Sequence, residues 1–307
     1  MRIAFLGTPE FSLPVLEALI ERGDTLAVFT QPDRPVGRKA VLTPPPVKTL
    51  AQSHGIPVFQ FEKIRSDEGV AALSAFMPDL MVTAAFGQLL STKNLAVPPL
   101  GTINVHGSLL PKYRGASPIQ AAILNGDAVT GVTTMFTDIG MDTGDILLKR
   151  EVPIAPDDTY GTLSEKLSHA GAALLLETLD RLEKGKLVRT KQNDDEATIC
   201  HILKKEDGVL RFDLPCAAVH DHVRAMNPWP TASAKLDGQP LKIWQTSLCA
   251  TDLNPKPFGT LTVLGDRLFV HCQGGALEIL SLQAPGKKRM DAKNFLLGNA
   301  VNGKRLL

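Results

Sequence analysis

Two polar side chains that could carry out chemistry lie two residues apart in a short apolar segment. Asn104 and His106 alternate with Ile103 and Val105, so both polar side chains share one face of a predicted strand, which Gly107 ends. An amide N–H can stabilise an oxyanion, and an imidazole, which titrates near neutral pH, can accept and release a proton. The pair therefore predicts a site where negative charge is stabilised and a proton moves. The structural alternative is a histidine whose ring only completes hydrogen bonds in the core.

An acidic loop could supply a third group. Residues 138–145 contain two glycines and three aspartates between two predicted strands. One of these carboxylates could approach His106 across the sheet and hold the imidazole ring in place. A calcium site and a simple turn are the two alternatives, although the loop lacks the EF-hand pattern. The loop sequence alone leaves all three interpretations open.

The surrounding elements predict how these groups are positioned. Apolar runs and helical periodicities alternate along the first two-thirds of the chain, which is typical of βαβ units and of an α/β fold with a mostly parallel sheet. Ligands of such sheets bind beyond the carboxyl ends of the strands, which is where His106 stands. The predicted strands cover residues 3–6, 26–29, 57–59, 80–85, 102–106, 132–137 and 146–150, and the predicted helices cover residues 11–21, 47–54, 67–76, 118–124 and 163–182.

The sequence pattern changes near residue 190. Residues 193–196 are polar and acidic, which is typical of a linker. After a predicted helix at 215–225, short strand-like pieces with turn signals recur up to residue 282, which favours a small β-barrel or sandwich. We therefore expect a first domain at 1–189, a linker at 190–207 and a second domain at 208–307.

The charge distribution bears on possible partners. The whole chain has 33 Lys and Arg against 32 Asp and Glu, which excludes a uniformly basic, histone-like binder. Residues 203–307 alone have 14 basic against 9 acidic side chains. This excess fits binding of a polyanion such as nucleic acid, and ordinary scatter of charge is the alternative.

Several functional classes are excluded by missing motifs. The first βα turn, residues 7–12, has one glycine instead of the GxGxxG of dinucleotide binders, so we expect no NAD(P) or FAD. There is no P-loop, and no HExxH or cysteine pair that suggests a metal site. No apolar run approaches the ~18 residues of a membrane span. The four cysteines are widely spaced, so we expect reduced thiols in a cytoplasmic protein.

Several segments of the chain resemble a known family. The segments 104–111, 114–119 and 141–145 resemble the signature of enzymes that use 10-formyltetrahydrofolate. Residues 30–38, 227–230 and 280–288 narrow the resemblance to methionyl-tRNA formyltransferases, over essentially the whole chain.

This resemblance implies a fold and a function. The fold would be a Rossmann-like catalytic domain followed by a small OB-like, tRNA-binding β-barrel. The activity would be transfer of the formyl group of 10-formyltetrahydrofolate to the α-amino group of methionyl initiator tRNA, for translation initiation, by a cytoplasmic monomer. Formyl transfer to an amino sugar or another small amine by the same core is the alternative.

The resemblance also assigns residues to roles. It implies that Asn104, His106 and Asp142 are catalytic. It implies that the turn of Ser108, Leu109, Leu110 and Pro111 belongs to the folate site. The tRNA would be contacted by Arg34, Arg38, Lys39, Lys287 and Lys288, although a solvated turn is the alternative for the last two. The family usually continues after Arg38 with glycine and further lysines, whereas this chain continues Lys39-Ala40-Val41, so the strength of the tRNA contact is an open question.

Overall fold

The chain folds into two compact units. The computed structural model describes residues 1–37, 40–248 and 253–307. The first unit comprises Met1–Gly115, Val129–Pro153 and Ser164–Cys200, and the second comprises Ala116–Ala128, Ile154–Leu163 and His201–Leu307. The domain limits expected at residues 189 and 208 stay a prediction.

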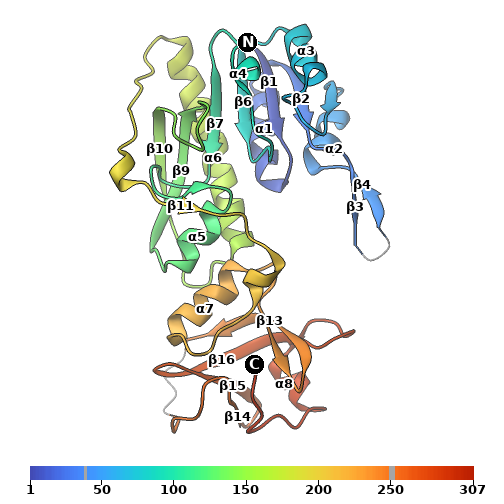
Figure 1. Cartoon of the computed structure of the whole chain (residues 1–307), viewed down its shortest axis with the longest axis vertical. Helices are drawn as coiled ribbons and strands as arrows, with labels where there is room; N and C mark the ends of the chain where they lie inside the picture. Colours follow the sequence, from blue (N-terminus) through green and yellow to red (C-terminus); the bar gives the residue numbers. More distant parts are fainter. Residues whose placement is uncertain (38–39, 249–252) are drawn as a thin grey trace. The chain divides into compact units, whose positions relative to one another are not determined.

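The first unit is built on a seven-stranded sheet (Figure 1). The strands from β7 to β5 are parallel, whereas β9 and β10 are antiparallel to their neighbours. The predicted mostly parallel α/β sheet is thereby confirmed. The strand order is β10 (Ile146–Pro153), β9 (Val129–Phe136), β7 (Thr102–His106), β6 (Leu80–Ala84), β1 (Arg2–Gly7), β2 (Thr25–Thr30) and β5 (Val58–Gln60).

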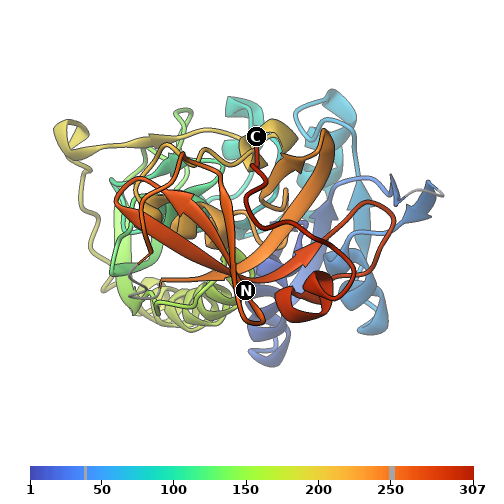
Figure 2. The same ribbon diagram turned by 90° about the horizontal axis from the view of Figure 1, so that it is seen from below.

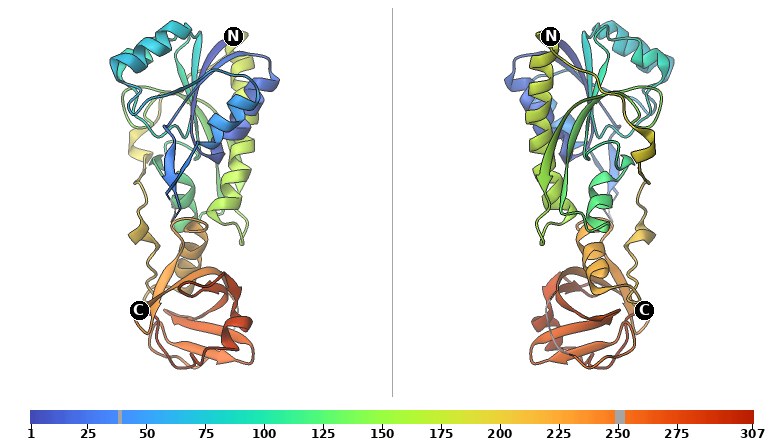
Figure 3. Two further views of the ribbon diagram at one scale, coloured as in Figure 1. Left: turned by 90° about the vertical axis from the view of Figure 1, so that its right-hand side faces the viewer. Right: turned by 90° about the vertical axis from the view of Figure 1, so that its left-hand side faces the viewer.

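Helices bury both faces of this sheet, as parallel sheets require. Ile3 and Phe5 pack on one side with α1, α2 and α6, whereas Ala4 and Leu6 pack on the other side in a core that includes residues of α3 and α4. Figure 3 shows α3 and α6 on opposite sides of the strands. The helix bounds are α1 Leu13–Glu21, α2 Pro46–Ser53, α3 Asp67–Phe76, α4 Thr92–Leu95 and α6 Tyr160–Glu183.

The second unit contains an antiparallel sheet, whose orange and red strands are drawn in Figure 2. Residues 304–307 hydrogen-bond to both of its edge strands: the N–H of Lys235 in β12 donates to the carbonyl of Leu307, and the N–H of Leu261 in β14 donates to that of Lys304. The predicted small barrel-like β domain is thereby confirmed. Its elements are α5 Pro118–Leu124, α7 Cys216–Ala225, β12 Ser233–Leu236, β13 Gln239–Ser247, β14 Leu261–Leu264, β15 Arg267–Cys272, β16 Gly275–Gln283, β17 Met290–Asp291 and α8 Ala292–Leu296.

Two short strand pairs were not expected. Strands β3 (Arg34–Val36) and β4 (Val41–Thr43) form an exposed hairpin. Strand β8 (Arg114–Gly115) pairs in parallel with β11 (Ile199–Cys200), which lies in the segment interpreted as a linker. Strands of two or three residues are too short to show a hydrophobic period, so the sequence pattern does not predict them.

The expectations of no membrane span and of reduced cysteines can be compared with the described residues. Within 1–37, 40–248 and 253–307, no helix has the length and apolar character needed to cross a membrane. The described cysteines Cys200, Cys216 and Cys272 form no disulfide.

Candidate active site

Strand β7 positions the two polar side chains identified in the sequence. Ile103 and Val105 point into the core shared with α6, which leaves Asn104 and His106 on the opposite face. Thr83, paired with Asn104 in the β6–β7 register, donates its hydroxyl hydrogen to Asn104 Oδ1 at 2.8 Å. Because the amide oxygen is occupied in this way, the amide N–H₂ is the part of Asn104 that can serve a ligand.

The ring of His106 is held on both sides. Its Nε2 lies 3.0 Å from the carbonyl oxygen of Tyr113. A carbonyl only accepts hydrogen bonds, so Nε2 carries a proton in this arrangement. The other nitrogen, Nδ1, faces Oδ2 of Asp142 at 3.7 Å. The His106 side chain is 6% exposed, so a second proton on the ring would be attracted to this carboxylate in a largely buried position.

The loop 138–145 is fixed by hydrogen bonds within the loop and by hydrogen bonds from other segments. Oδ1 of Asp138 accepts from the Gly140 N–H at 3.0 Å and from the Thr143 hydroxyl at 2.7 Å. Oδ2 of Asp142 accepts from the Gly115 N–H at 2.8 Å, so this carboxylate joins the loop to β8. Asp142 itself has φ +55°, a left-handed conformation that is costly for most residues. The structure therefore answers one question left open by the sequence: Asp142 lies beside His106.

The turn after His106 folds back over β9. The Ser108 hydroxyl donates to the Lys112 carbonyl at 2.6 Å, and the Thr133 hydroxyl of β9 donates to the Ser108 carbonyl at 2.7 Å. Ser108 and Leu110 are fully buried, whereas Leu109 and Pro111 are partly exposed. The role of this turn in folate binding stays a prediction.

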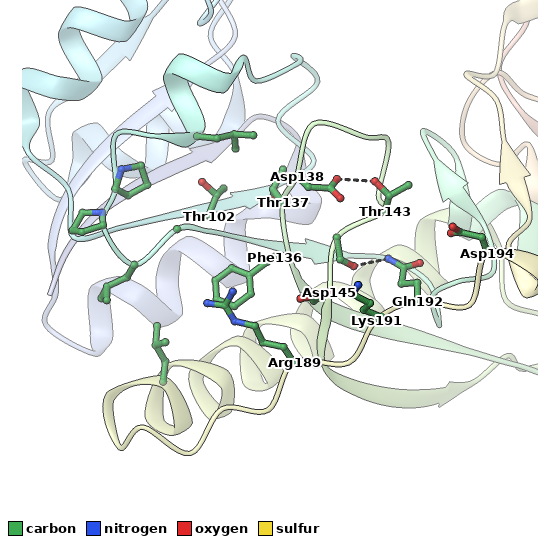
Figure 4. A pocket seen from close by; sticks show the side chains of 17 residues that line it. Thr102, Phe136, Thr137, Asp138, Thr143, Asp145, Arg189, Lys191, Gln192 and Asp194 are labelled. Atoms are coloured by element: carbon green, nitrogen blue, oxygen red, sulfur yellow. Dashed lines mark hydrogen bonds between the residues drawn. The ribbon is translucent and has the colours of Figure 1, made fainter.

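A cavity of about 760 Å³ is lined by residues close in sequence to these groups (Figure 4). Thr102, which shares a face of β7 with Asn104, lines it, and so do Thr143 and Gly144, which follow Asp142. No local sequence pattern predicts this cavity, because its residues come from segments far apart in the chain. The side chains labelled in Figure 4 are those of Thr102, Phe136, Thr137, Asp138, Thr143, Asp145, Arg189, Lys191, Gln192 and Asp194.

Polar groups of this cavity suit a polar ligand. The hydroxyl oxygens of Thr102 and Thr137 are buried without a hydrogen-bond partner in the described part of the chain. An orphaned buried hydroxyl is costly unless something bonds to it. The guanidinium of Arg189 lies 4.0 Å from the ring centroid of Phe136 on the cavity wall. Across the described residues, no group of three or more His, Cys, Asp or Glu could hold a metal ion.

Of the residues expected to contact tRNA in the first unit, Arg34 lies on the β3–β4 hairpin. Arg34 is exposed, and its Nη2 lies 2.5 Å from Oε2 of Glu62. At the base of the hairpin, Gln60 donates to Asp33, and Lys48 pairs with it at 2.8 Å; both contacts lower the pKa of the Asp33 carboxyl. Arg38 and Lys39 lie outside the described residues.

The residues expected to contact tRNA in the second unit lie in the turn between β16 and β17. Lys287 and Lys288 are exposed, and neither forms an ion pair within the part of the chain that the structure describes. The neighbouring Arg289 lies 5.3 Å from the ring centroid of Trp244, and Lys242 lies 5.6 Å from it. No local sequence pattern predicts that Lys242 joins this basic cluster, because Lys242 lies on β13, far from the turn in sequence.

Comparisons with known proteins agree with this architecture. The family described as "Formyl transferase" matches residues 1–179, and "Formyl transferase, C-terminal domain" matches residues 202–300. A protein of Trichlorobacter lovleyi named "Methionyl-tRNA formyltransferase" is 47% identical over 302 residues, which are 98% of this chain and 95% of that protein.

Solved structures share the fold at low sequence identity. HypX from Aquifex aeolicus, in complex with tetrahydrofolic acid, superposes with a TM-score of 0.67 at 17% identity, covering 96% of this chain and 47% of HypX. This chain thus spans about half the length of HypX. An N-formyltransferase from Helicobacter canadensis, in complex with folinic acid and dTDP-3-aminofucose, has a TM-score of 0.69 at 18% identity, covering 90% of this chain and 98% of that one. At these identities the likeness shows a common fold.

Proposed function

Because this chain belongs to the methionyl-tRNA formyltransferase family, we propose that it transfers the formyl group of 10-formyltetrahydrofolate to the α-amino group of methionyl initiator tRNA. The observation that carries the proposal is the meeting of an amide, an imidazole and a carboxylate at the end of β7. Asn104 and His106 share one face of the strand, and Asp142 lies 3.7 Å from His106. Similarity at 47% identity over nearly the whole chain favours this acceptor over a small amine.

Each side chain has a distinct role in the proposed reaction. The free amine attacks the formyl carbon, a new C–N bond forms, and the carbonyl oxygen becomes negative. Asn104, whose amide N–H₂ is left available by Thr83, donates a hydrogen bond to this oxyanion. The bond from the formyl carbon to N10 of the folate then breaks, and N10 takes a proton as it leaves.

His106 carries the proton between the two nitrogens. For the reaction, the ring leaves the Tyr113 carbonyl and carries its single proton on Nδ1, which faces Asp142. The unprotonated Nε2 then accepts the proton that the amine loses and delivers it to N10. Asp142, opposite Nδ1, stabilises the ring while both of its nitrogens are protonated. Catalytic hydrogen bonds are often long before substrate binds, so the 3.7 Å separation is compatible with this role.

We further propose that the cavity beside Asn104 receives the pterin ring of the folate. Its volume of about 760 Å³ lies within the ~300–1,000 Å³ usual for small-molecule sites. Asp138, Asp145 and Arg189 also line the cavity and are polar side chains that suit the polar edge of such a ring. A ring placed there brings the attached formyl group toward Asn104, which shares a strand face with Thr102.

The experiment compares wild type with His106→Ala in formyl transfer from 10-formyltetrahydrofolate to methionyl initiator tRNA. Loss of the proton carrier should lower kcat/KM on the order of a hundredfold or more, as removal of a transition-state contact does. His54→Ala, at an exposed position, is the matched control and should keep the wild-type rate. An unchanged rate in His106→Ala would contradict the proposal. Transfer by wild type to an amino sugar and not to the tRNA would support the alternative acceptor.

A further inference from the structure

The side chain of Gln192 connects two segments of the candidate site. Its Nε2 donates to the carbonyl of Asp142 at 2.7 Å and to that of Gly144 at 2.8 Å. Its Oε1 accepts from Nε of Arg114 at 3.0 Å. Figure 4 shows Gln192 beside the loop 138–145 at the cavity wall. Gln192 lies in the segment 190–207, which the sequence pattern marked only as a linker.

Arg114 leads from Gln192 back to the catalytic residues. Its side chain is almost fully buried, and its Nη2 pairs with Asp194 at 2.7 Å. The residue before it, Tyr113, provides the carbonyl that holds His106, and the residue after it provides the N–H that holds Asp142. The contacts therefore close a ring that runs from His106 through segment 113–115 and Gln192 to Asp142, which faces His106 again.

Asp142 needs such support. Its backbone adopts φ +55°, a left-handed conformation that Asp tolerates better than most residues but that still costs more than a right-handed one. Two neighbouring carbonyls of this strained stretch, those of Asp142 and Gly144, receive hydrogen bonds from one amide group. Loss of that amide would remove both bonds at once and release the backbone that carries the carboxylate.

The contacts of Gln192 also indicate how it affects the reaction. Both of its amide hydrogens are used within the protein, so it has no donor left for a substrate. A residue of this kind should change the rate of the chemical step, and because Gln192 also lines the cavity, the KM for folate can change with it.

We infer that Gln192 is a positioning residue for catalysis: together with Arg114 it holds Asp142 in front of His106. This inference rests on the proposed function, because it assigns Gln192 a part in the same reaction. It predicts that the two hydrogen bonds donated to the loop raise kcat, and that they do so by holding the carboxylate of Asp142 in position.

The first test measures kcat and KM for Gln192→Met and Gln192→Glu. Gln192→Met loses every hydrogen bond of the side chain, whereas Gln192→Glu keeps an acceptor for Arg114 and loses both donors. Both variants should lower kcat by about tenfold to a hundredfold, the cost of a catalytic group misplaced by about 1 Å, with the KM for methionyl-tRNA within about twofold. Gln52→Met, the same change at an exposed position of α2, is the control. A wild-type kcat in both variants, or a raised KM for folate at unchanged kcat, would overturn the inference.

The second test separates positioning from general stability. Each Gln192 variant is combined with Asp142→Asn in a double-mutant cycle. If Gln192 acts through the carboxylate, its replacement should lower kcat by less than about twofold in the Asp142→Asn background. A full, multiplicative loss in the double variant would overturn the inference, whatever the Tm of the variants. Failure of wild type to transfer formyl to methionyl-tRNA would refute the proposed function instead, so the two failures are distinguishable.

Discussion

Oδ2 of Asp142 lies 3.7 Å from Nδ1 of His106, and the same oxygen accepts the backbone N–H of Gly115. The other two aspartates of the loop do not face His106. The carboxylate of Asp138 accepts hydrogen bonds within the loop, and Asp145, whose carbonyl accepts from the Phe136 N–H, directly precedes β10. One carboxylate of three is thus selected by the fold to face the imidazole. The negative charge at this position is the property that the reaction should require.

Asp142→Asn tests that requirement. The asparagine carbonyl can still accept the Gly115 N–H, so the loop should keep its conformation while the charge facing His106 is lost. We expect kcat to fall on the order of a hundredfold, as for loss of other electrostatic contacts to a transition state. Asp180→Asn, on the exposed surface of α6, is the control and should have the wild-type kcat. A fully active Asp142→Asn would show that its charge is dispensable.

Gly144→Ala should disturb the same loop by steric overlap. A Cβ at this position would lie 1.8 Å from the carbonyl oxygen of Phe136, which is backbone and cannot move aside independently. We expect the free energy of unfolding to fall by about 1–3 kcal/mol, with a matching loss of activity. Gly298→Ala, where no atom lies within 4 Å of the added carbon, is the control. Equal melting temperatures for Gly144→Ala and wild type would contradict this prediction.

The two partnerless hydroxyls of the cavity can be removed without changing side-chain shape. Thr102→Val and Thr137→Val should leave the Tm unchanged or raise it, because a buried unsatisfied group disappears. Neither oxygen is exposed in the cavity, so each variant should leave the Kd for folate within about twofold of wild type. Thr30→Val removes another partnerless hydroxyl, on β2 and away from the cavity, and should not change the Kd. A lower Tm in both cavity variants would contradict this prediction.

The ion pair between Arg34 and Glu62 predicts that replacing one partner or the other has opposite effects on the affinity for tRNA. Glu62→Gln should free the guanidinium for phosphate and tighten binding of tRNA, whereas Arg34→Gln should weaken it. Arg34→Gln should also reduce the slope of log K against log salt by about one. Lys93→Gln, exposed and paired with Asp67, is the control for removal of a surface charge. Affinities that respond to neither change at the hairpin would exclude Arg34 from the interface.

The lowered pKa values of three buried or partly buried histidines predict that the protein loses stability in acid. Burial is the largest cause that lowers the pKa of His220, of His222 and of His271 below the ordinary value of 6.5. Above pH 6.5 both folded and unfolded states hold these rings neutral, so their contribution to stability is fully present. As the pH falls below 6.5 the unfolded chain binds protons first, and stability declines until the lower, folded-state pKa values are passed.

Thermal melts at pH 7.5 and pH 5 measure this loss. The Tm should be lower at pH 5, and His271→Gln should reduce the difference, since a glutamine can bond to Thr262 without taking up a proton. His54→Gln, at an exposed position of the first unit, serves as the control. A pH difference that His271→Gln leaves intact would assign the effect to other groups.

The sequence predicted the elements that bury a long periodic face and missed those that do not. The alternation around Ile103 and Val105 correctly predicted the strand and the shared face of Asn104 and His106. The strands β8 and β11 have two residues each and pair across a long stretch of chain, so no local alternation of apolar and polar residues predicts them. The place of Asp142 came from a family resemblance, because three aspartates in one loop look alike until the loop is folded.

Gln192 shows the same limit for a single side chain. A glutamine in a polar, irregular segment carries no local signal of function. Its partners are backbone carbonyls of the loop 138–145 and the side chain of Arg114, all distant in sequence. Only the folded chain brings these groups together, and the cavity beside them could not be predicted for the same reason.

Residues 304–307 have a consequence that concerns association between molecules. By bonding to both β12 and β14, they cover two strand edges that would otherwise offer unpaired N–H and carbonyl groups. Open edges of this kind are templates for pairing with another chain. A change that detaches this short segment should therefore first cause self-association and loss of solubility. The molecules that stay in solution should keep the activity of His106, which lies in the other unit.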